Sequence, residues 1–273
     1  MTNAANPAAT SSAVPPPPKR SLGDILFDVI LWGGIATLLI ISFAPANMYN
    51  IPRLFVGSEQ MSEFAADFTQ PDWSNWKTYV EQMWLTIQIA LWGTFLAVII
   101  AVPLGLAAAR NIAPWWVVQP VRRVLDVLRS IPDLVMGTLF IVAVGLGPLA
   151  GVLALALNTG GVLGKLFSEA VESIDKAPVE GVRATGGAPL HEIVWGVIPQ
   201  VAPLWTSFAL YRFESNSRAA TVLGLIGAGG IGQLLFQSLQ GFEHRQVAAI
   251  AIVIVVAVAA IDLLSQTIRK RLL

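Results

Sequence analysis

Residues 82–109, QMWLTIQIALWGTFLAVIIAVPLGLAAA, contain no charged side chain over 28 consecutive positions. A helix rises about 1.5 Å per residue, so about 20 apolar residues cross the hydrocarbon core of a bilayer. The stretch is therefore long enough to span a membrane with tilt, or with a bend at Pro103. It predicts an all-α integral membrane protein.

Further apolar stretches extend this prediction along the chain. Residues 25–45 and 246–268 each give one candidate span, and residues 197–214 give a third that begins with prolines. Residues 130–168 are too long for one helix, and the GLGP sequence at 145–148 divides them into two. We therefore expect about six transmembrane helices.

The composition excludes several other classes of protein. The 273 residues include 17 basic and 17 acidic side chains, and charged residues make up only 12% against 55% hydrophobic. A soluble domain usually carries about 25% charged residues, so a soluble globule is excluded. There is no cysteine, and the only histidines are His191 and His244, so we expect no disulfide framework and no metal site. A net charge of zero argues against nucleic acid as a partner. We expect membrane lipid to surround the apolar helices instead.

The basic residues predict the orientation, because cytoplasmic loops of membrane proteins are rich in Lys and Arg. With six spans, three basic clusters fall on one side of the membrane. These clusters are Lys19 and Arg20; Arg110, Arg122, Arg123 and Arg129; and Arg269, Lys270 and Arg271. We therefore expect a multi-pass protein of the cell (plasma or inner) membrane with both termini in the cytoplasm.

The N-terminal segment has a composition of its own. Residues 1–20 are rich in Ala, Pro, Ser and Thr, which predicts a disordered cytoplasmic arm before a transmembrane domain at 21–273. A cleaved signal peptide is the alternative, with Ala44-Pro45-Ala46 as its cleavage site. The apolar core of about 20 residues is longer than the 7–15 that are typical of such signals.

Residues 170–196, between the fourth and fifth spans, predict an ordered elbow. Pro178 suits the first turn of a helix, and Glu180 places an acid near its positive end. The glycines at 186–187 can end that helix, and a second short helix can run over 189–195. We expect a helix–turn–helix lying along the inner surface of the membrane.

The spacing of Glu180, Gly186 and Pro199 resembles the EAA loop of ABC importer permeases, E-A-A-x3-G-x9-I-x-L-P. The departures from this pattern are Gly181 and Val182 for the alanines, Gly196 for the isoleucine and Ile198 for the leucine. Residues 209–233, ALYRFESNSRAATVLGLIGAGGIGQ, resemble phosphonate-type ABC permeases, and this resemblance covers residues 80–273.

The resemblance implies the architecture of a type I ABC importer permease. It implies a dimeric, alternating-access pathway for phosphonate or a related oxyanion such as phosphate or phosphite. The implied partners are a second permease copy or a paralogue, two cytosolic ATPase subunits and an extracytoplasmic solute-binding protein. The chain itself would be non-catalytic and hold no cofactor, with ATP and Mg bound by the partner ATPase.

The resemblance and the elbow together indicate a set of residues that couple to the ATPase. They are Glu180, Arg183, Thr185, Gly186, Gly187, Ala188, Pro189 and Pro199. Three of them match the family motif, and the others are included because they lie in the elbow. An ordered amphipathic loop without a partner is the alternative.

The sequence GAGGIG at 227–232 formally matches the dinucleotide-binding pattern G-x-G-x-x-G. That site requires a βαβ unit and an acidic residue about 20 positions later, whereas an apolar span follows here. A P-loop is also absent, because Thr159 stands where its first glycine would be. We instead expect irregular backbone over 216–241 on the outer side, near the pore mouth or the binding protein, although a purely structural turn is also open. The residues concerned are Gly227, Gly229, Gly230 and Gly232.

Arg212, Glu214 and Arg218 form a charged cluster that we place at the outer end of the fifth span. Charges inside a membrane are costly and are functional candidates by default. Glu214 and Arg218 can pair with each other at i,i+4 on a helix. Alternatively, the arginines contact a passing oxyanion, whose geometry suits guanidinium.

Two rival functions share these features. An amino-acid or methionine-type importer permease would keep the architecture and change the cargo. An ion-coupled secondary transporter would need a carboxylate near the middle of a span, and the sequence has none in a central position.

Overall fold

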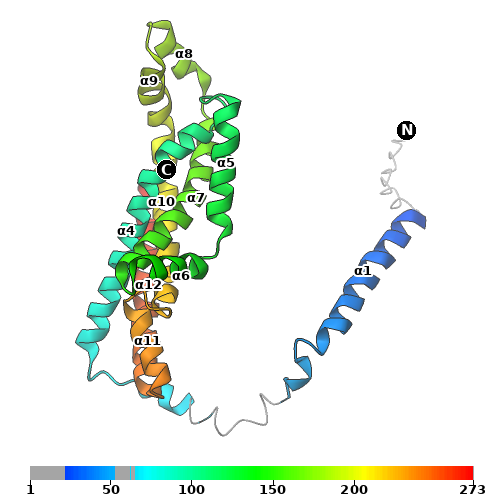
Figure 1. Ribbon diagram of the computed structural model, residues 1–273, viewed down its shortest axis with the longest axis vertical. Coiled ribbons are helices and arrows are strands. Elements are labelled where there is room, and N and C mark those ends of the chain that lie inside the picture. The colour runs from blue at the N-terminus through cyan, green and yellow to red at the C-terminus, as the bar shows by residue number, and fades with distance from the viewer. Residues whose placement is uncertain (1–21, 53–61, 63–64, 273) are drawn as a thin grey trace, which may run out of the picture. The chain divides into compact units, whose positions relative to one another are not determined.

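The computed structural model describes residues 22–52, 62 and 65–272, coloured in Figure 1. The chain divides into two compact units, residues 1–62 and 63–273, and each is described by itself. The arm expected over 1–20 lies outside the described residues.

The first unit contains helix α1 (Leu22–Phe43), followed by the short 3₁₀ turn η1 (Met48–Asn50). Apolar side chains surround α1, and the unit buries none of them. The hydroxyl of Thr37 donates a hydrogen bond to the carbonyl of Gly33 (2.7 Å), so this polar group is satisfied within the helix. A helix of this length and hydropathy can cross a membrane, as the sequence predicts for 25–45.

The second unit is all helical among its described residues. From residue 76 on, its helices are α4 (Trp76–Ala108), α5 (Trp115–Ser130), α6 (Asp133–Val144), α7 (Pro148–Glu172), α8 (Lys176–Ala184), α9 (Pro189–His191), the π-helical segment η2 (Glu192–Val197), α10 (Ile198–Gly224), α11 (Ile231–Gln240) and α12 (His244–Leu272). Figure 1 shows α7 packed beside α4 and α5, with α8 and α9 at one end and α11 toward the other.

Small residues bring α4 and α7 into close contact. A β-carbon added to Gly93 would lie 2.7 Å from Cβ of Leu155, and one added to Gly105 would lie 2.8 Å from Cβ of Phe167. Small residues at such positions let membrane helices approach closely, where van der Waals packing replaces the hydrophobic effect. Phe167 also stacks on Trp205 of α10, with ring centroids 4.6 Å apart. The two contacts make α7 the centre of the helical unit.

The third expected span, the first part of residues 130–168, contains only α6, and α5 is a separate helix before it. α5 and α6 meet at an angle of 93°, and α6 has only 12 residues, about 18 Å of helix. The break lies at Ile131, which is extended (φ −81°, ψ 121°) because Pro132 follows it. The GLGP break is confirmed, with φ of +91° at Gly145 and +134° at Gly147. The described part of the chain has five helices able to cross a membrane, or six if the bent pair counts as one.

The prediction of irregular backbone over 216–241 is wrong for most of that range. α10 continues to Gly224 and α11 runs from Ile231 to Gln240, so only residues 225–230 and Gly241 are non-helical within that range. Glycines in a sequence do not by themselves indicate a long irregular segment. Here they stop α10 and start α11 within one tight turn.

Candidate functional site

The elbow predicted between the fourth and fifth spans begins at α8. The carboxylate of Asp175 caps this helix by accepting a hydrogen bond from the N–H of Ala177 (3.0 Å). Pro178 is the third residue of α8, within the first turn as expected. The helix therefore starts where the Asp175 side chain satisfies one of its free N–H groups.

The end of α8 is a glycine-dependent turn. The N–H of Gly186 donates to the carbonyl of Arg183 (3.0 Å), and the N–H of Gly187 donates to the carbonyl of Val182 (3.4 Å). These two bonds define a Schellman motif, in which the first residue past the cap is left-handed. Gly186 has φ +81°, which L side chains rarely adopt. The predicted helix stop at 186–187 is confirmed, and Gly186 is the residue that allows it.

Two contacts hold α8 against the segment that follows. Arg183 donates through Nε and Nη2 to both carboxylate oxygens of Glu192 (2.9 and 2.8 Å), a forked ion pair across the turn. The hydrogen bond to Glu192, with the attraction of its charge, raises the pKa of Arg183 above its usual range. Gly196 lets η2 approach α8, because an added β-carbon would lie 3.0 Å from Cα of Val179. Of the two glycines that depart from the family pattern, Gly196 is thus required for close packing, and Gly181 is not.

The second half of the elbow is not a separate short helix over 189–195. α9, η2 and α10 run on without a break, and the wider π-helical turn lies directly before Pro199. Proline has no N–H for the carbonyl one turn back, and a π-bulge accommodates that loss. Gln200 then ties the base of α10 to the start of the elbow, since its amide accepts from the N–H of Asp175 (3.1 Å) and donates to the carbonyl of Asp175 (3.2 Å).

Most of the predicted coupling residues lie on the surface of this braced elbow. The exposed ones are Glu180, Arg183, Thr185, Gly186, Ala188, Pro189 and Pro199, and Gly187 is half-buried. A pocket of about 270 Å³ opens beside them, lined by Lys176, Glu180, Arg183 and Asn111 among others. The elbow therefore presents a charged, solvent-facing surface on a rigid frame.

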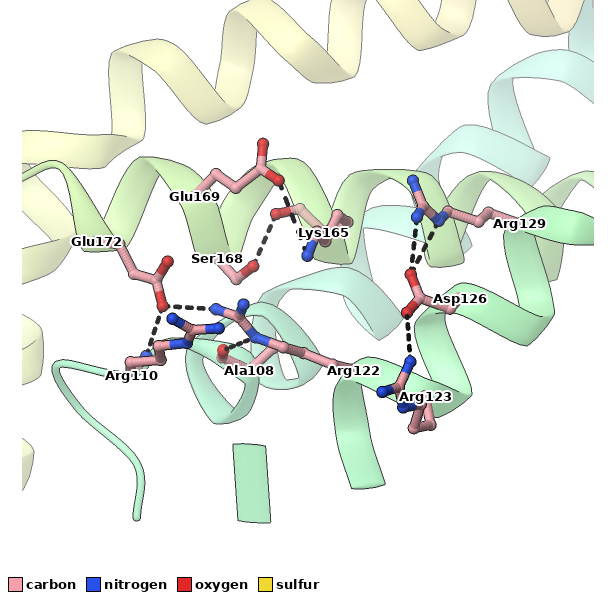
Figure 2. A network of polar contacts seen from close by, with 10 residues as sticks. All are labelled: Ala108, Arg110, Arg122, Arg123, Asp126, Arg129, Lys165, Ser168, Glu169 and Glu172. Atoms are coloured by element: carbon pink, nitrogen blue, oxygen red, sulfur yellow. Dashed lines mark hydrogen bonds and ion pairs between the residues drawn. The ribbon is translucent and has the colours of Figure 1, made fainter. Parts of the chain in front are cut away.

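A second polar cluster holds the elbow to the helical core (Figure 2). Arg122 of α5 binds Glu172, the last residue of α7 (Nη2 to Oε1, 2.5 Å), and its Nε donates to the carbonyl of Ala108 (3.0 Å). The N–H of Arg110 donates to the same Glu172 oxygen (2.8 Å). We call this group the Arg122–Glu172 clamp. It joins α4, α5 and α7 at the point where the chain leaves for the elbow.

We expect Arg122→Ala to destabilise the protein by about 1–3 kcal/mol, because the Ala108 carbonyl and the Glu172 carboxylate both lose a donor. The neighbouring Arg123→Ala is the matched control. The side chain of Arg122 is 14% exposed, whereas that of Arg123 is 79% exposed and 3.9 Å from Asp126. Thermal melting of the purified protein in detergent should show a lower transition for Arg122→Ala only. Equal melting of the two variants would contradict a structural role for the clamp.

A buried polar chain crosses the centre of the unit between α4, α10 and α7. Asn216 donates through Nδ2 to the hydroxyl of Thr94 (2.8 Å), and the hydroxyl of Thr159 donates to Oδ1 of Asn216 (2.9 Å). Arg212 reaches the same Thr159 oxygen from one turn away (3.5 Å). Its Nε is buried and has no hydrogen-bond partner in the described structure. Sequence reasoning singled out Arg212 but not this polar chain.

The predicted charged cluster is split by the structure and is not at the outer end of its helix. α10 continues ten residues beyond Glu214, which lies between Arg218 (3.0 Å) and Arg269 near the end of α12 (3.3 Å). The local pair of Glu214 and Arg218 is therefore confirmed. Arg212 lies on a different face, because a two-residue step rotates a helix by about 200°.

The glycine motif forms the turn between α10 and α11. Gly227 (φ +101°) closes a second Schellman motif, and the N–H of Ile231 donates to the hydroxyl of Thr86 (2.9 Å). Gly229, Gly230 and Gly232 are buried, which favours the structural-turn interpretation. The residues at 65–272 contain no strand for a dinucleotide-binding unit. Across all described residues, no group of three His, Cys, Asp or Glu is placed to hold a metal.

The sequence patterns did not indicate several residues of the site. Glu192, Gln200, Glu172 and Asn216 brace the elbow or the core, yet none of them stands in a recognisable motif. The sequence indicates Arg122 only as part of a basic cluster on the cytoplasmic side. The only signal in the sequence is that each is a polar residue within or beside an apolar span. This signal does not indicate which residue it contacts.

Comparison with known proteins identifies the family. Residues 101–273 match the family model described as "Binding-protein-dependent transport system inner membrane component". The chain is 42% identical over 225 residues to a phosphite transport system permease protein of Stutzerimonas stutzeri, covering 82% of each chain. It is 45% identical over 189 residues to a phosphate-import permease protein of Mycolicibacterium smegmatis, covering 69% of this chain and 36% of that protein.

A solved structure has the same fold. The MetNI methionine ABC transporter, in an inward-facing conformation, matches with a TM-score of 0.64 over 71% of this chain and 95% of the matched chain. The sequences are 22% identical, so this likeness concerns the fold alone. It agrees with the type I importer permease architecture expected from the sequence. The chain belongs to the family of binding-protein-dependent transport system inner membrane components, and it is a non-catalytic, multi-pass ABC transporter permease subunit.

Proposed function

We propose that this chain forms the solute pathway of an ATP-driven importer for an oxyanion of phosphorus, namely phosphite, phosphate or a phosphonate. The support is its identity of 42% and 45% to permeases named for phosphite and phosphate. A methionine-type cargo has weaker support, because the methionine transporter is 22% identical. Two copies of the chain, or this chain with a paralogue, would enclose an alternating-access pathway that receives solute from an extracytoplasmic binding protein.

The proposed orientation places the elbow and both termini in the cytoplasm. Arg269, Lys270 and Arg271 end α12, and Arg122 lies beside the base of the elbow. Basic residues of this kind remain on the cytoplasmic side during insertion. The turn between α10 and α11 then lies toward the outer side.

In this arrangement the elbow docks on the cytosolic ATPase, which binds ATP and Mg. The forked Arg183–Glu192 pair and the Gln200 bonds brace the elbow from within. The exposed Glu180, Ala188 and Pro189 remain free to make an intermolecular contact. A rigid surface transmits a movement of its partner to the clamp, where α4, α5 and α7 meet.

Arg212 is the residue that we propose contacts the solute. Its buried Nε lacks a hydrogen-bond partner, and an unsatisfied buried donor costs about 1–3 kcal/mol. A guanidinium at membrane depth suits a tetrahedral oxyanion, which accepts paired hydrogen bonds. Arg218 already binds Glu214, so it is left out of this contact.

The proposal is tested by uptake into proteoliposomes that contain this permease, its genomically adjacent ATPase and its binding protein. We expect ATP-dependent uptake of labelled phosphite, phosphate or 2-aminoethylphosphonate, and none of methionine. Uptake of methionine alone would overturn the proposed cargo.

We expect Arg212→Ala to lower the uptake of the oxyanion at least tenfold with normal complex assembly. Arg218→Ala is the matched control on the same helix. It should keep most of the uptake, because Glu214 still binds Arg269. Equal uptake by Arg212→Ala and the unmodified complex would remove Arg212 from the solute pathway.

A further inference from the structure

A polar cleft of about 340 Å³ lies between the first part of α4 and α11. Its lining is Thr78, Gln82, Gly230, Gln233, Leu234 and Gln237. No titratable side chain is among these residues. Three carboxamides and a hydroxyl therefore line a cleft in a chain of which only 12% is charged and 55% is hydrophobic.

The polar residues are placed periodically on both helices. Thr78 and Gln82 are four apart on α4, as are Gln233 and Gln237 on α11, so each pair occupies one face of its helix. The two helices pack against each other beside the turn at 225–230. The hydrogen bond from Ile231 N–H to the hydroxyl of Thr86 fixes their register (2.9 Å).

The opposite face of α4 has the character of a lipid-facing surface. Val80 and Trp84 are two residues from Thr78 and Gln82, which is about half a turn, and they are 52% and 59% exposed. They line an apolar cleft of about 410 Å³ together with Ile252 and Val256 of α12. The contrast between the two faces of one helix indicates that the glutamine face meets water, because exposed polar groups are costly in lipid.

We propose that this glutamine cleft is an outer binding station for the transported oxyanion, which the solute occupies before it reaches Arg212. This inference rests on the proposed function. Carboxamide NH₂ groups can donate to the oxyanion and replace part of its hydration shell. Because the lining has no cation, the station binds weakly enough to release the ion inward, as a permeation pathway requires.

The first experiment measures whether water and phosphate reach the cleft. The chain has no cysteine, so single cysteines at Gln82, Gln233 and Gln237 are the only thiols in this subunit. In the assembled complex in proteoliposomes, we expect an impermeant, anionic methanethiosulfonate added outside to label them at least tenfold faster than cysteines at Val80 and Trp84. Millimolar inorganic phosphate should slow the labelling several-fold. Labelling no faster than at Val80 would overturn the inference, because it would show a cleft covered by protein or lipid.

The second experiment measures the effect of charge on transport. Gln82→Glu and Gln233→Glu keep the side-chain shape and add a negative charge, so we expect uptake at limiting solute to fall about tenfold. Gln240→Glu, an exposed change outside the cleft on the same helix, should leave uptake unchanged. Normal uptake by both cleft variants, or labelling that phosphate does not slow, would overturn the binding station.

The two proposals can fail separately. If the unmodified complex takes up no phosphorus oxyanion, the proposed function fails, and the binding station fails with it. If the unmodified complex transports normally and the cleft variants do too, only the binding station fails.

Discussion

Replacing Gly186 by valine should abolish most ATP-driven transport while the membrane helices stay folded. Gly186 has φ +81°, and a left-handed conformation costs an L residue about 1–2 kcal/mol, more when it is β-branched. The strain lies in the Schellman turn that ends α8. We expect the turn to relax to another conformation, which changes the orientation of α8 relative to η2. A shift of 1–2 kcal/mol lowers the ratio of the correct to the altered elbow roughly 5- to 30-fold.

Three matched variants separate this backbone effect from a simple change of size. A β-carbon at either Gly186 or Gly181 meets no atom within 4 Å, but only Gly186 has positive φ. Gly181→Ala should therefore keep normal coupling, Gly186→Ala should lose part of it, and Gly186→Asn should keep more than Gly186→Ala because Asn tolerates φ > 0. The measurements are co-purification of the ATPase and solute-stimulated ATP hydrolysis. Full coupling in Gly186→Val would contradict the elbow assignment.

Replacing Gly232 by alanine should damage the fold itself. Its added β-carbon would overlap the carbonyl oxygen of Thr221 and lie 3.1 Å from Cα of Gly224. The obstacles are backbone atoms, so the clash is relieved only by separating α11 from α10. Overpacking typically lowers the free energy of unfolding by about 1–3 kcal/mol. We expect a loss of about 3 kcal/mol or more here, because backbone atoms cannot move aside as a side chain can.

The expected result is an apparent melting temperature several degrees lower for Gly232→Ala, since about 1 kcal/mol corresponds to roughly 2–4 °C at this size. Gly241→Ala is the control at the other end of α11. The nearest atom to its added β-carbon is 3.4 Å away, and its φ is −77°. Melting of both variants in detergent, followed by size-exclusion chromatography, makes the comparison. Identical melting would show that α11 can move without loss of stability.

Neither the apolar spans nor the buried polar groups distinguish between the candidate functions of this chain. The spans alone allowed an ion-coupled secondary transporter. The family match contradicts that alternative. The polar chain from Thr94 to Asn216 and Thr159 has no carboxylate member. The expectation of no carboxylate inside a span is wrong, however, because Glu214 is buried within α10, where Arg218 and Arg269 pair with it. The structure positions the candidate solute residues, and the relatives name the chemistry that they are proposed to recognise.

The sequence alone determined the features that depend on local physics. Transfer of an apolar segment into lipid is a property of that segment, so residues 82–109 indicate a span without knowledge of any partner. Helix ends are equally local. The glycines at 186–187 and the GLGP sequence at 145–148 ended helices as expected, because φ and the missing proline N–H are properties of single residues. The break at Ile131–Pro132 is local in the same way, because proline disfavours the helical conformation of the residue before it.

Only the tertiary structure decided which polar groups meet. Arg122 and Glu172 are 50 residues apart, Thr94 and Asn216 are 122 apart, and Thr86 and Ile231 are 145 apart. No periodicity within one helix specifies a contact of this kind, because it depends on which helices pack and at what rotation. For the same reason, Arg212 and Glu214 have different partners although they are only two residues apart. Sequence patterns located the helices and the elbow, and the packing of α4, α7 and α10 assigned their polar residues to sites.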